Sequence, residues 1–257
     1  MKLPVNRFKA GLGGARPLAG SWIMTGSANA AEAMACTGLD FIIVDMEHTD
    51  AALGDVIAML RAIDGAGCEA VVRPPSVDPV TIRRLLDAGA RTIMVPFVET
   101  AAQARDIVSA TRYPPRGTRG LALMHRGSRY NQIPDYATTA DGEICIIAQI
   151  ETQTGIDNTE AIAAVDGIDA LFYGPGDLSC VVGEIGNTTG TAVRELIARE
   201  VRRCRDLGIA SGTLVPDLAS AEWAKSQPFD FISVGNDFGM IVRASREIAA
   251  ALGAGQP

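Results

Sequence analysis

The residues best suited to chemistry stand at the ends of short apolar segments. Four such segments end in polar residues, and these ends read Asp45-Met-Glu-His48, Arg73-Pro-Pro, Gln149-Ile-Glu151 and Gly174-Pro-Gly-Asp177. A polar side chain at such a position is costly to bury unless it is paired or binds a ligand. The four ends are therefore the candidates for an active site.

Glu151 and Asp177 are the candidate metal ligands. Two carboxylates without a Cys or His cluster suit a hard divalent ion such as Mg²⁺ or Mn²⁺, and they leave coordination positions for water and a chelating oxo-acid. The alternative is that both carboxylates accept hydrogen bonds from backbone amides at helix starts. The turn Gly174-Pro-Gly176 exposes backbone amides beside a helix start, which favours binding of a substrate carboxylate.

His48 is the candidate general acid or base. A lone histidine is more often structural, but Asp45 and Glu47 stand directly before this one, and a carboxylate can orient the ring and raise its basicity. Arg73 follows the next apolar segment and can stabilise an enolate or oxyanion. The alternative for Arg73 is a structural ion pair.

Other chemistries find less support in the sequence. The five cysteines are odd in number and scattered, which is typical of reduced thiols, and none has a basic partner nearby in sequence to make it a nucleophile. Lysine is absent around the ends of the apolar segments, which argues against a Schiff-base aldolase. Asp87 and His125 are ambiguous from spacing alone, and surface positions are their default interpretation.

Composition limits the class of protein further. The chain has 257 residues with 23 Lys plus Arg and 30 Asp plus Glu, so its net charge is 23 − 30 = −7, and 47% of its residues are hydrophobic. This composition excludes disorder, and the absence of a basic run argues against nucleic acid or an anionic membrane as a partner. The first residues resemble no signal peptide and no apolar run reaches about 18 residues, so we expect a soluble cytoplasmic protein.

Short apolar segments alternate with helical patterns along the whole chain. The segments are rich in Val and Ile and mostly lack alternation, as is typical of a parallel sheet buried on both faces. The expected strands are 20–24, 41–45, 70–73, 92–96, 144–150, 170–173, 209–214 and 231–234. The expected helices are 29–36, 51–63, 78–88, 100–111, 154–165, 191–207, 217–225 and 238–252.

Eight β/α units in a chain of this length predict a single closed (β/α)8 (TIM) barrel over residues 1–257. An open dinucleotide-binding sheet is the alternative, but Gly11-Leu-Gly-Gly-Ala-Arg lacks the last glycine of that fingerprint and follows no strand. In a barrel the carboxyl ends of the strands meet on one face, so the four polar ends would lie together. The long connection 112–136, rich in Pro, Gly and Arg, is interpreted as a binding loop.

The chain resembles the HpcH/HpaI aldolase family, the class II, metal-dependent pyruvate aldolases. The matching stretches cover nearly the whole chain in order: FIIVDMEHTD, VVRPPSVDPVTIRRLLDAGA, MVPFVETAAQARDIVSATRYPPRGTRG, AQIETQTGIDN, DALFYGPGDLS, SGTLV and ISVGNDFGM. The related citrate lyase β-subunit group resembles it less well at DMEH and YPPRGTRG. His125-Arg126 in the long loop is more similar to the 2-dehydro-3-deoxyglucarate aldolases than to the homoprotocatechuate-pathway (4-hydroxy-2-oxoheptanedioate) aldolases.

The resemblance implies a fold and an assembly. It implies a phosphoenolpyruvate/pyruvate-type barrel whose C-terminal helix is exchanged between neighbouring subunits, packed as a hexamer. It also implies that a divalent ion, Mg²⁺, Mn²⁺ or Co²⁺, is bound by Glu151 and Asp177.

The resemblance also implies roles for individual residues. His48 would be the acid/base group and Arg73 would stabilise the enolate. Gln149, Gly176 and Asp177 would contact the oxo-acid, and Trp22 would line the pocket. Either Asp45 or Asp87 would tune His48, and the two alternatives stay open. Gly176 departs from the Ala or Ser of many family members, a change that a backbone contact to substrate survives.

The implied reaction is the reversible cleavage of 4-hydroxy-2-oxo acids, such as 2-keto-3-deoxy sugar acids, into pyruvate or hydroxypyruvate and an aldehyde through a metal-stabilised enolate. One alternative is a carbon–carbon lyase that acts on 4-hydroxy-2-oxoheptanedioate or on an acyl thioester. Another is a non-catalytic sensor of oxo-acids. A base beside a metal site argues against the sensor, because a protein that only binds its ligand needs no base.

Overall fold

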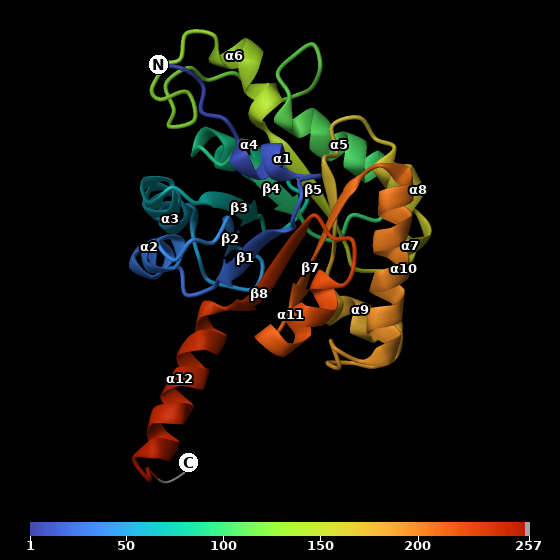
Figure 1. Ribbon diagram of the computed structural model, residues 1–257. Helices are drawn as coiled ribbons and strands as arrows, with labels where there is room; N and C mark the ends of the chain where they lie inside the picture. The colour runs from blue at the N-terminus through green and yellow to red at the C-terminus, as the bar shows by residue number, and fades with distance from the viewer. Residues whose placement is uncertain (255–257) are drawn as a thin grey trace.

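The computed structural model describes residues 1–254, and its centre is a closed barrel of eight parallel strands (Figure 1). Each strand pairs with the next along the chain, and β8 pairs with β1 to close the barrel. The predicted (β/α)8 barrel is confirmed. The strands are β1 Leu18–Ile23, β2 Phe41–Asp45, β3 Glu69–Arg73, β4 Thr92–Val95, β5 Cys145–Ile150, β6 Ala170–Tyr173, β7 Ala210–Val215 and β8 Phe231–Asn236.

Seven of the eight expected helices are present with ends that agree to within about three residues. They are α2 Ala28–Ala35, α3 Leu53–Ala66, α4 Pro79–Asp87, α5 Ala101–Thr111, α10 Thr191–Leu207, α11 Leu218–Lys225 and α12 Asp237–Ala251. The prediction of a single helix over 154–165 is wrong. Two helices, α7 Gln153–Asp157 and α8 Thr159–Ala163, stand in its place and meet at Asn158. The side chain of Asn158 donates a hydrogen bond to the Glu99 carbonyl at 2.8 Å.

Four short helical elements lie outside the eight expected helices. They are α1 Arg7–Gly11, α6 Tyr136–Thr139, the 3₁₀ helix η1 Ala140–Glu143 and α9 Pro175–Val181, of which only the start of α9 was expected, beside the turn Gly174-Pro-Gly176. Of these, α1 closes the amino-terminal end of the barrel. Its Phe8 ring lies 5.1 Å from the rings of both Phe41 and Phe231, at the starts of β2 and β8.

Glycines on two strands make room for these aromatic rings inside the barrel. A Cβ added at Gly20 of β1 would overlap the ring of Phe41, and one added at Gly212 of β7 would overlap the ring of Phe231. Both rings are fully buried. The barrel interior is therefore filled by large side chains from some strands because neighbouring strands carry none at the same level.

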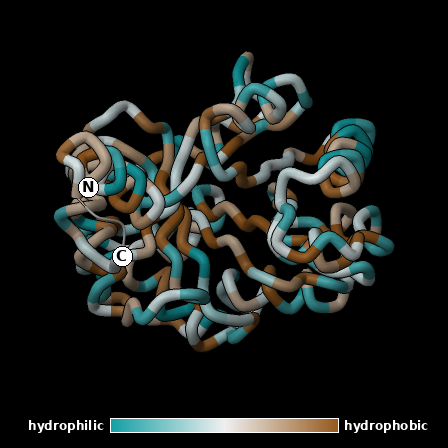
Figure 2. Tube along the Cα trace, turned by 90° about the horizontal axis from the view of Figure 1, so that it is seen from below, coloured by the Kyte–Doolittle hydropathy of each residue, from teal (hydrophilic) through white to brown (hydrophobic). Residues whose placement is uncertain are grey.

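A second apolar layer lies between the strands and the surrounding helices. It includes Ile42 and Val44 of β2, which point away from the barrel interior and pack with Leu60 and Ile63 of α3. Figure 2 shows the hydrophobic segments concentrated in the strands and the hydrophilic ones mainly along the outer helices. The strands are thus buried on both faces, as their unbroken apolar composition predicts.

The last helix, α12, leaves the barrel instead of packing against it (Figure 1). Its start is anchored because the buried carboxylate of Asp237 accepts hydrogen bonds from the backbone of Met24 at 2.9 Å and of Thr25 at 3.1 Å. Beyond this residue the helix is exposed, including the side chains of Phe238, Ile241 and Ile248. Among the residues described, no helix is long and apolar enough to cross a lipid bilayer.

The connection 112–136 is ordered around the buried guanidinium of Arg119. This group lies over the ring of Tyr113 at 4.5 Å and donates to Asp87 Oδ1 at 2.8 Å. Arg126 donates to the Ala88 carbonyl just after α4. These contacts tie the connection to the end of α4, and therefore to the amino-terminal side of the barrel. Its interpretation as a binding loop stays a prediction.

We predict that Gly20→Ala lowers the free energy of unfolding by about 1–3 kcal/mol, because the added methyl group forces the buried Phe41 ring to move. Gly65→Ala in α3 is the matched control. Apart from its own helix backbone and chain neighbours, no atom of residues 1–254 lies within 4 Å of its added Cβ, so helix propensity should raise the same free energy by up to about 1 kcal/mol. Urea denaturation of the two variants measures both effects, and equal values would contradict the packing argument.

Candidate active site

The predicted residues meet at the carboxyl ends of the strands, around the buried guanidinium of Arg73. At the end of β3, its Nε donates to Asp45 Oδ1 at 2.8 Å, and its Nη1 lies 2.8 Å from Glu47 Oε2. The guanidinium also lies over the ring of Trp22, 4.4 Å from the ring centroid. Within residues 1–254, Nη2 carries no hydrogen bond or ion pair, so its N–H donors remain for a substrate oxygen.

Trp22 is fixed by a hydrogen bond of its own. Its Nε1 donates to Ser233 Oγ of β8 at 2.9 Å, and only 4% of the residue is exposed. Trp22 therefore supports Arg73 from the interior of the barrel, and its contact with the site runs through this cation–π interaction.

Glu151 stands directly after β5 with both carboxylate oxygens engaged. Gln149 Nε2 donates to Oε1 at 2.5 Å, and the backbone N–H of Phe97 donates to Oε2 at 3.4 Å. Gly174, at the end of β6, leaves the space that this carboxylate fills, because a Cβ there would overlap Oε1. Asp177 follows in the first turn of α9.

The electrostatics of this end of the barrel favour a cation. The pKa of Glu151 is raised to about 8, chiefly by burial and also by the negative charge of Asp177, while Arg73 opposes the shift. Burial also raises the pKa of Glu47, again opposed by Arg73 and reinforced by Asp177. Three carboxylates thus lie close enough to repel one another, and a divalent ion would relieve that repulsion.

The residues present fit a divalent metal ion. Glu151 and Asp177 supply hard carboxylate oxygens, and the absence of a side chain at Gly174 lets the Glu151 carboxylate occupy its place. Residues 1–254 contain no cluster of three or more His, Cys, Asp or Glu side chains in a ligand arrangement. Two carboxylates with free positions are the donor set of Mg²⁺ and similar ions, which retain water or bind a chelating substrate.

His48 lies at the rim of the site with 59% of its side chain exposed. Its Nε2 is 3.7 Å from Glu47 Oε2. Neither residue expected to tune it is its partner within one chain. Asp45 bonds to Arg73, and Asp87 bonds to Arg119 and lies 3.7 Å from His125 Nε2, at the end of α4. The choice between Asp45 and Asp87 therefore stays a prediction.

Glu47 was considered from the sequence only as a carboxylate that could orient His48, and its pairing with Arg73 was not expected. Its Oε2 lies 2.8 Å from Arg73 Nη1 and 3.7 Å from His48 Nε2, so it stands between the two. Its contacts place it closer to His48 than either aspartate.

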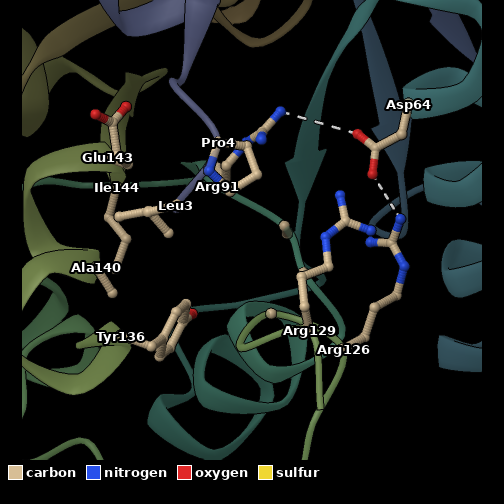
Figure 3. Close-up of a pocket in the computed structure, with 13 residues that line it drawn as sticks. Leu3, Pro4, Asp64, Arg91, Arg126, Arg129, Tyr136, Ala140, Glu143 and Ile144 are labelled. Atoms are coloured by element: carbon tan, nitrogen blue, oxygen red, sulfur yellow. Dashed lines mark hydrogen bonds and ion pairs between the residues drawn. The ribbon is translucent and has the colours of Figure 1, made fainter. Parts of the chain in front are cut away.

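A second, small cavity of about 30 Å³ lies away from this site. Figure 3 shows Arg91 and Arg126 directed at Asp64, which accepts a hydrogen bond from Arg126 Nη2 at 2.5 Å. Arg91 also pairs with Glu69 at the start of β3. The cavity therefore belongs to an ion-pair network at the amino-terminal end of the barrel and contains none of the predicted site residues.

Comparison with known proteins agrees with this geometry. Residues 18–244 match the family model described as HpcH/HpaI aldolase/citrate lyase. The chain belongs to this family. It is an aldolase, a carbon–carbon lyase that cleaves 4-hydroxy-2-oxo acids, and aldolases of this family depend on a divalent metal ion. The family resemblance inferred from the sequence is confirmed.

Individual relatives cover almost the whole chain. The aldolase is 43% identical over 235 residues, 91% of each chain, to the 2-dehydro-3,6-dideoxy-6-sulfogluconate aldolase of Pseudomonas putida. It is 41% identical over 248 residues, 96% of this chain and 97% of the other, to a hydroxypyruvate/pyruvate aldolase of Chromohalobacter salexigens. A crystal structure of a family protein from Burkholderia cenocepacia superposes with a TM-score of 0.92 at 37% identity, covering 96% and 99% of the two chains.

We predict that the metal-free aldolase becomes less stable as the pH rises from about 4.5 to about 8 through the titration of Glu151. Its raised pKa means that the folded protein keeps a proton that the unfolded chain releases. This contribution is complete below the unfolded pKa and lost as the pH passes the folded one, with an upper limit of about 5 kcal/mol. Glu151→Gln should flatten this part of the profile in denaturation at several pH values. Parallel profiles for the two proteins would contradict the raised pKa.

Proposed function

We propose that this aldolase releases pyruvate or hydroxypyruvate from 4-hydroxy-2-oxo acids whose aldehyde part is hydroxylated, such as 2-keto-3-deoxy sugar acids. The observation that carries the reaction is the buried Arg73 facing the carboxylate pair Glu151 and Asp177 at one end of the barrel. The aldehyde class is supported by the sugar-acid substrate in the name of the Pseudomonas putida relative.

Glu151 and Asp177 would hold the divalent ion, Mg²⁺, Mn²⁺ or Co²⁺. When bound there, the ion supplies Lewis-acid polarisation of the oxo-acid and charge stabilisation of its enolate. Gln149 holds Glu151 in place through its amide, which keeps one carboxylate oxygen oriented. Gly176 and Asp177, at the start of α9, contact the oxo-acid, with Gly176 acting through its backbone.

Arg73 and His48 are the two side chains that act on the substrate directly. Arg73 is held by Asp45, Glu47 and Trp22, so its remaining N–H donors are already oriented when the enolate oxygen develops charge. His48 transfers the proton between the substrate hydroxyl and the solvent-facing rim. Glu47 Oε2 lies 3.7 Å from its Nε2.

The test of this function is pyruvate release from a 2-keto-3-deoxy sugar acid with added Mg²⁺, Mn²⁺ or Co²⁺ and again with EDTA. We expect metal-dependent release that EDTA abolishes. His48→Ala should lower turnover by about 10²–10⁴-fold, because a general acid/base is lost, while the metal remains bound. Lys225→Ala, which alters an exposed surface pair with Glu222, is the control and should leave turnover unchanged.

The other outcomes separate the alternatives. Activity only in the aldol direction with pyruvate or hydroxypyruvate and short aldehydes would keep the chemistry and reject the sugar-acid substrate. Cleavage only of 4-hydroxy-2-oxoheptanedioate or of an acyl thioester would reassign the substrate. Metal and oxo-acid binding without turnover would mean an oxo-acid sensor. Normal turnover of His48→Ala would reject the role of His48.

We also propose that α12 is exchanged between subunits of an oligomer such as a hexamer. The large apolar side chains of this helix and of the residue that follows it are exposed: Phe238, Met240, Ile241, Val242, Ile248 and Leu252. A cavity of about 690 Å³ lies beside β1, α2 and β8, where a barrel normally carries its eighth helix. In the proposed exchange, the exposed apolar face of α12 from a second copy occupies this cavity.

The mass in solution tests this assembly. We expect sedimentation equilibrium to give a multiple of the chain mass for the native protein and a smaller species for Ile241→Glu, because a charge on the exposed apolar face opposes its burial. Arg246→Glu, on the same helix, controls for a general effect of charge. A monomeric native protein would reject the exchange.

A further inference from the structure

One residue beside the site has a backbone conformation that its side chain does not explain. Phe97 has φ = 52°, in the left-handed region that glycine and asparagine adopt readily and an aromatic residue does not. The other non-glycine residues with positive φ in the described chain are consecutive, Arg129 to Asn131, in the loop 112–136. Of these four residues, Phe97 alone lies just after a strand, β4, at the end of the barrel that holds the site.

Packing of the ring does not account for this conformation. The side chain is 40% exposed, and Phe97 belongs to neither of the apolar clusters that fill the barrel and surround it. A strained backbone persists only when surrounding contacts hold it, and such strain gathers at sites where the geometry serves a function. The contacts that hold Phe97 are made by its backbone.

Two successive peptide groups after β4 bind the end of β5. The Val98 N–H donates to the Gln149 carbonyl at 3.0 Å, and the Phe97 N–H donates to Glu151 Oε2 at 3.4 Å. Because Val98 is held by β5, the φ of Phe97 determines where the preceding peptide group points. A negative φ would turn that N–H away from Glu151.

We propose that Phe97 is a positioning residue for the metal ligand Glu151. Its left-handed backbone directs an N–H at Oε2, while Gln149 binds Oε1, so the carboxylate is held from both oxygens and keeps lone pairs for the metal. Such outer contacts typically change metal affinity by about 10–100-fold when lost. This inference rests on the proposed function in one respect, that Glu151 binds the metal.

The test compares two substitutions that both remove the ring. Phe97→Asn keeps a residue that adopts the left-handed conformation, whereas Phe97→Val introduces a β-branched residue that disfavours it strongly. We expect the dissociation constant of Mn²⁺, measured by calorimetry on the full chain, to rise at least about tenfold in Phe97→Val and less than about threefold in Phe97→Asn. Thermal unfolding without metal shows that each variant is folded.

The contrary results are distinct. Native Mn²⁺ affinity in Phe97→Val would overturn the inference, and equal losses in both variants would assign the effect to the ring. Should Phe97→Val fail to fold, Phe97→Ala takes its place, with a smaller expected loss in the same direction. Glu151→Gln separates the two proposals. If it binds Mn²⁺ normally, the metal assignment itself fails; if it loses Mn²⁺ while Phe97→Val does not, only the role of Phe97 is rejected.

Discussion

Three carboxylates share one buried end of the barrel, and their mutual repulsion is the constraint around which the site is built. Glu47, Glu151 and Asp177 come from different segments, yet each affects the ionisation of another. In water their charges would be screened, but in a site of low dielectric the repulsion is large. Arg73 offsets part of it and has little freedom to move, because Asp45, Glu47 and Trp22 hold it on three sides. The remaining negative charge is what makes this end of the barrel suited to a divalent cation.

The rest of the barrel is arranged so that these groups can stay in place. The interior is rigid because aromatic rings fill spaces that glycines leave, as Gly20 does for Phe41, and Phe8 of α1 closes the opposite end. Ion pairs around Glu69 and Asp64 connect α1, α3 and the loop 112–136 at that amino-terminal end. Stability and chemistry are therefore separated between the two ends of the barrel, the usual division in this fold.

The long helix α12 is exposed beyond its first residue. Asp237 fixes its first turn to the backbone after β1, so its direction is set by hydrogen bonds and not by packing. An apolar helix face in water and an uncovered groove beside β1 and β8 are both unfavourable for a single chain. The proposed exchange of α12 between subunits would cover both surfaces at once.

Much of the architecture was predictable because local sequence patterns indicate its strands and helices. Unbroken Val- and Ile-rich segments and periodic helices predicted eight β/α units, and the polar ends Asp45–His48, Arg73, Glu151 and Asp177 predicted where the site lies. Local patterns do not show which distant residue a given side chain will contact. Only the tertiary structure shows that Asp87 bonds to Arg119, that Glu47 joins Arg73 to His48, that α1 closes the barrel, and that the backbone of Phe97 meets Glu151. Those contacts join residues that lie far apart in the chain and that no local pattern connects. The sequence by itself therefore determined the eight strands, seven of the eight expected helices and the residues of the candidate site, whereas the packing decided which side chains meet there.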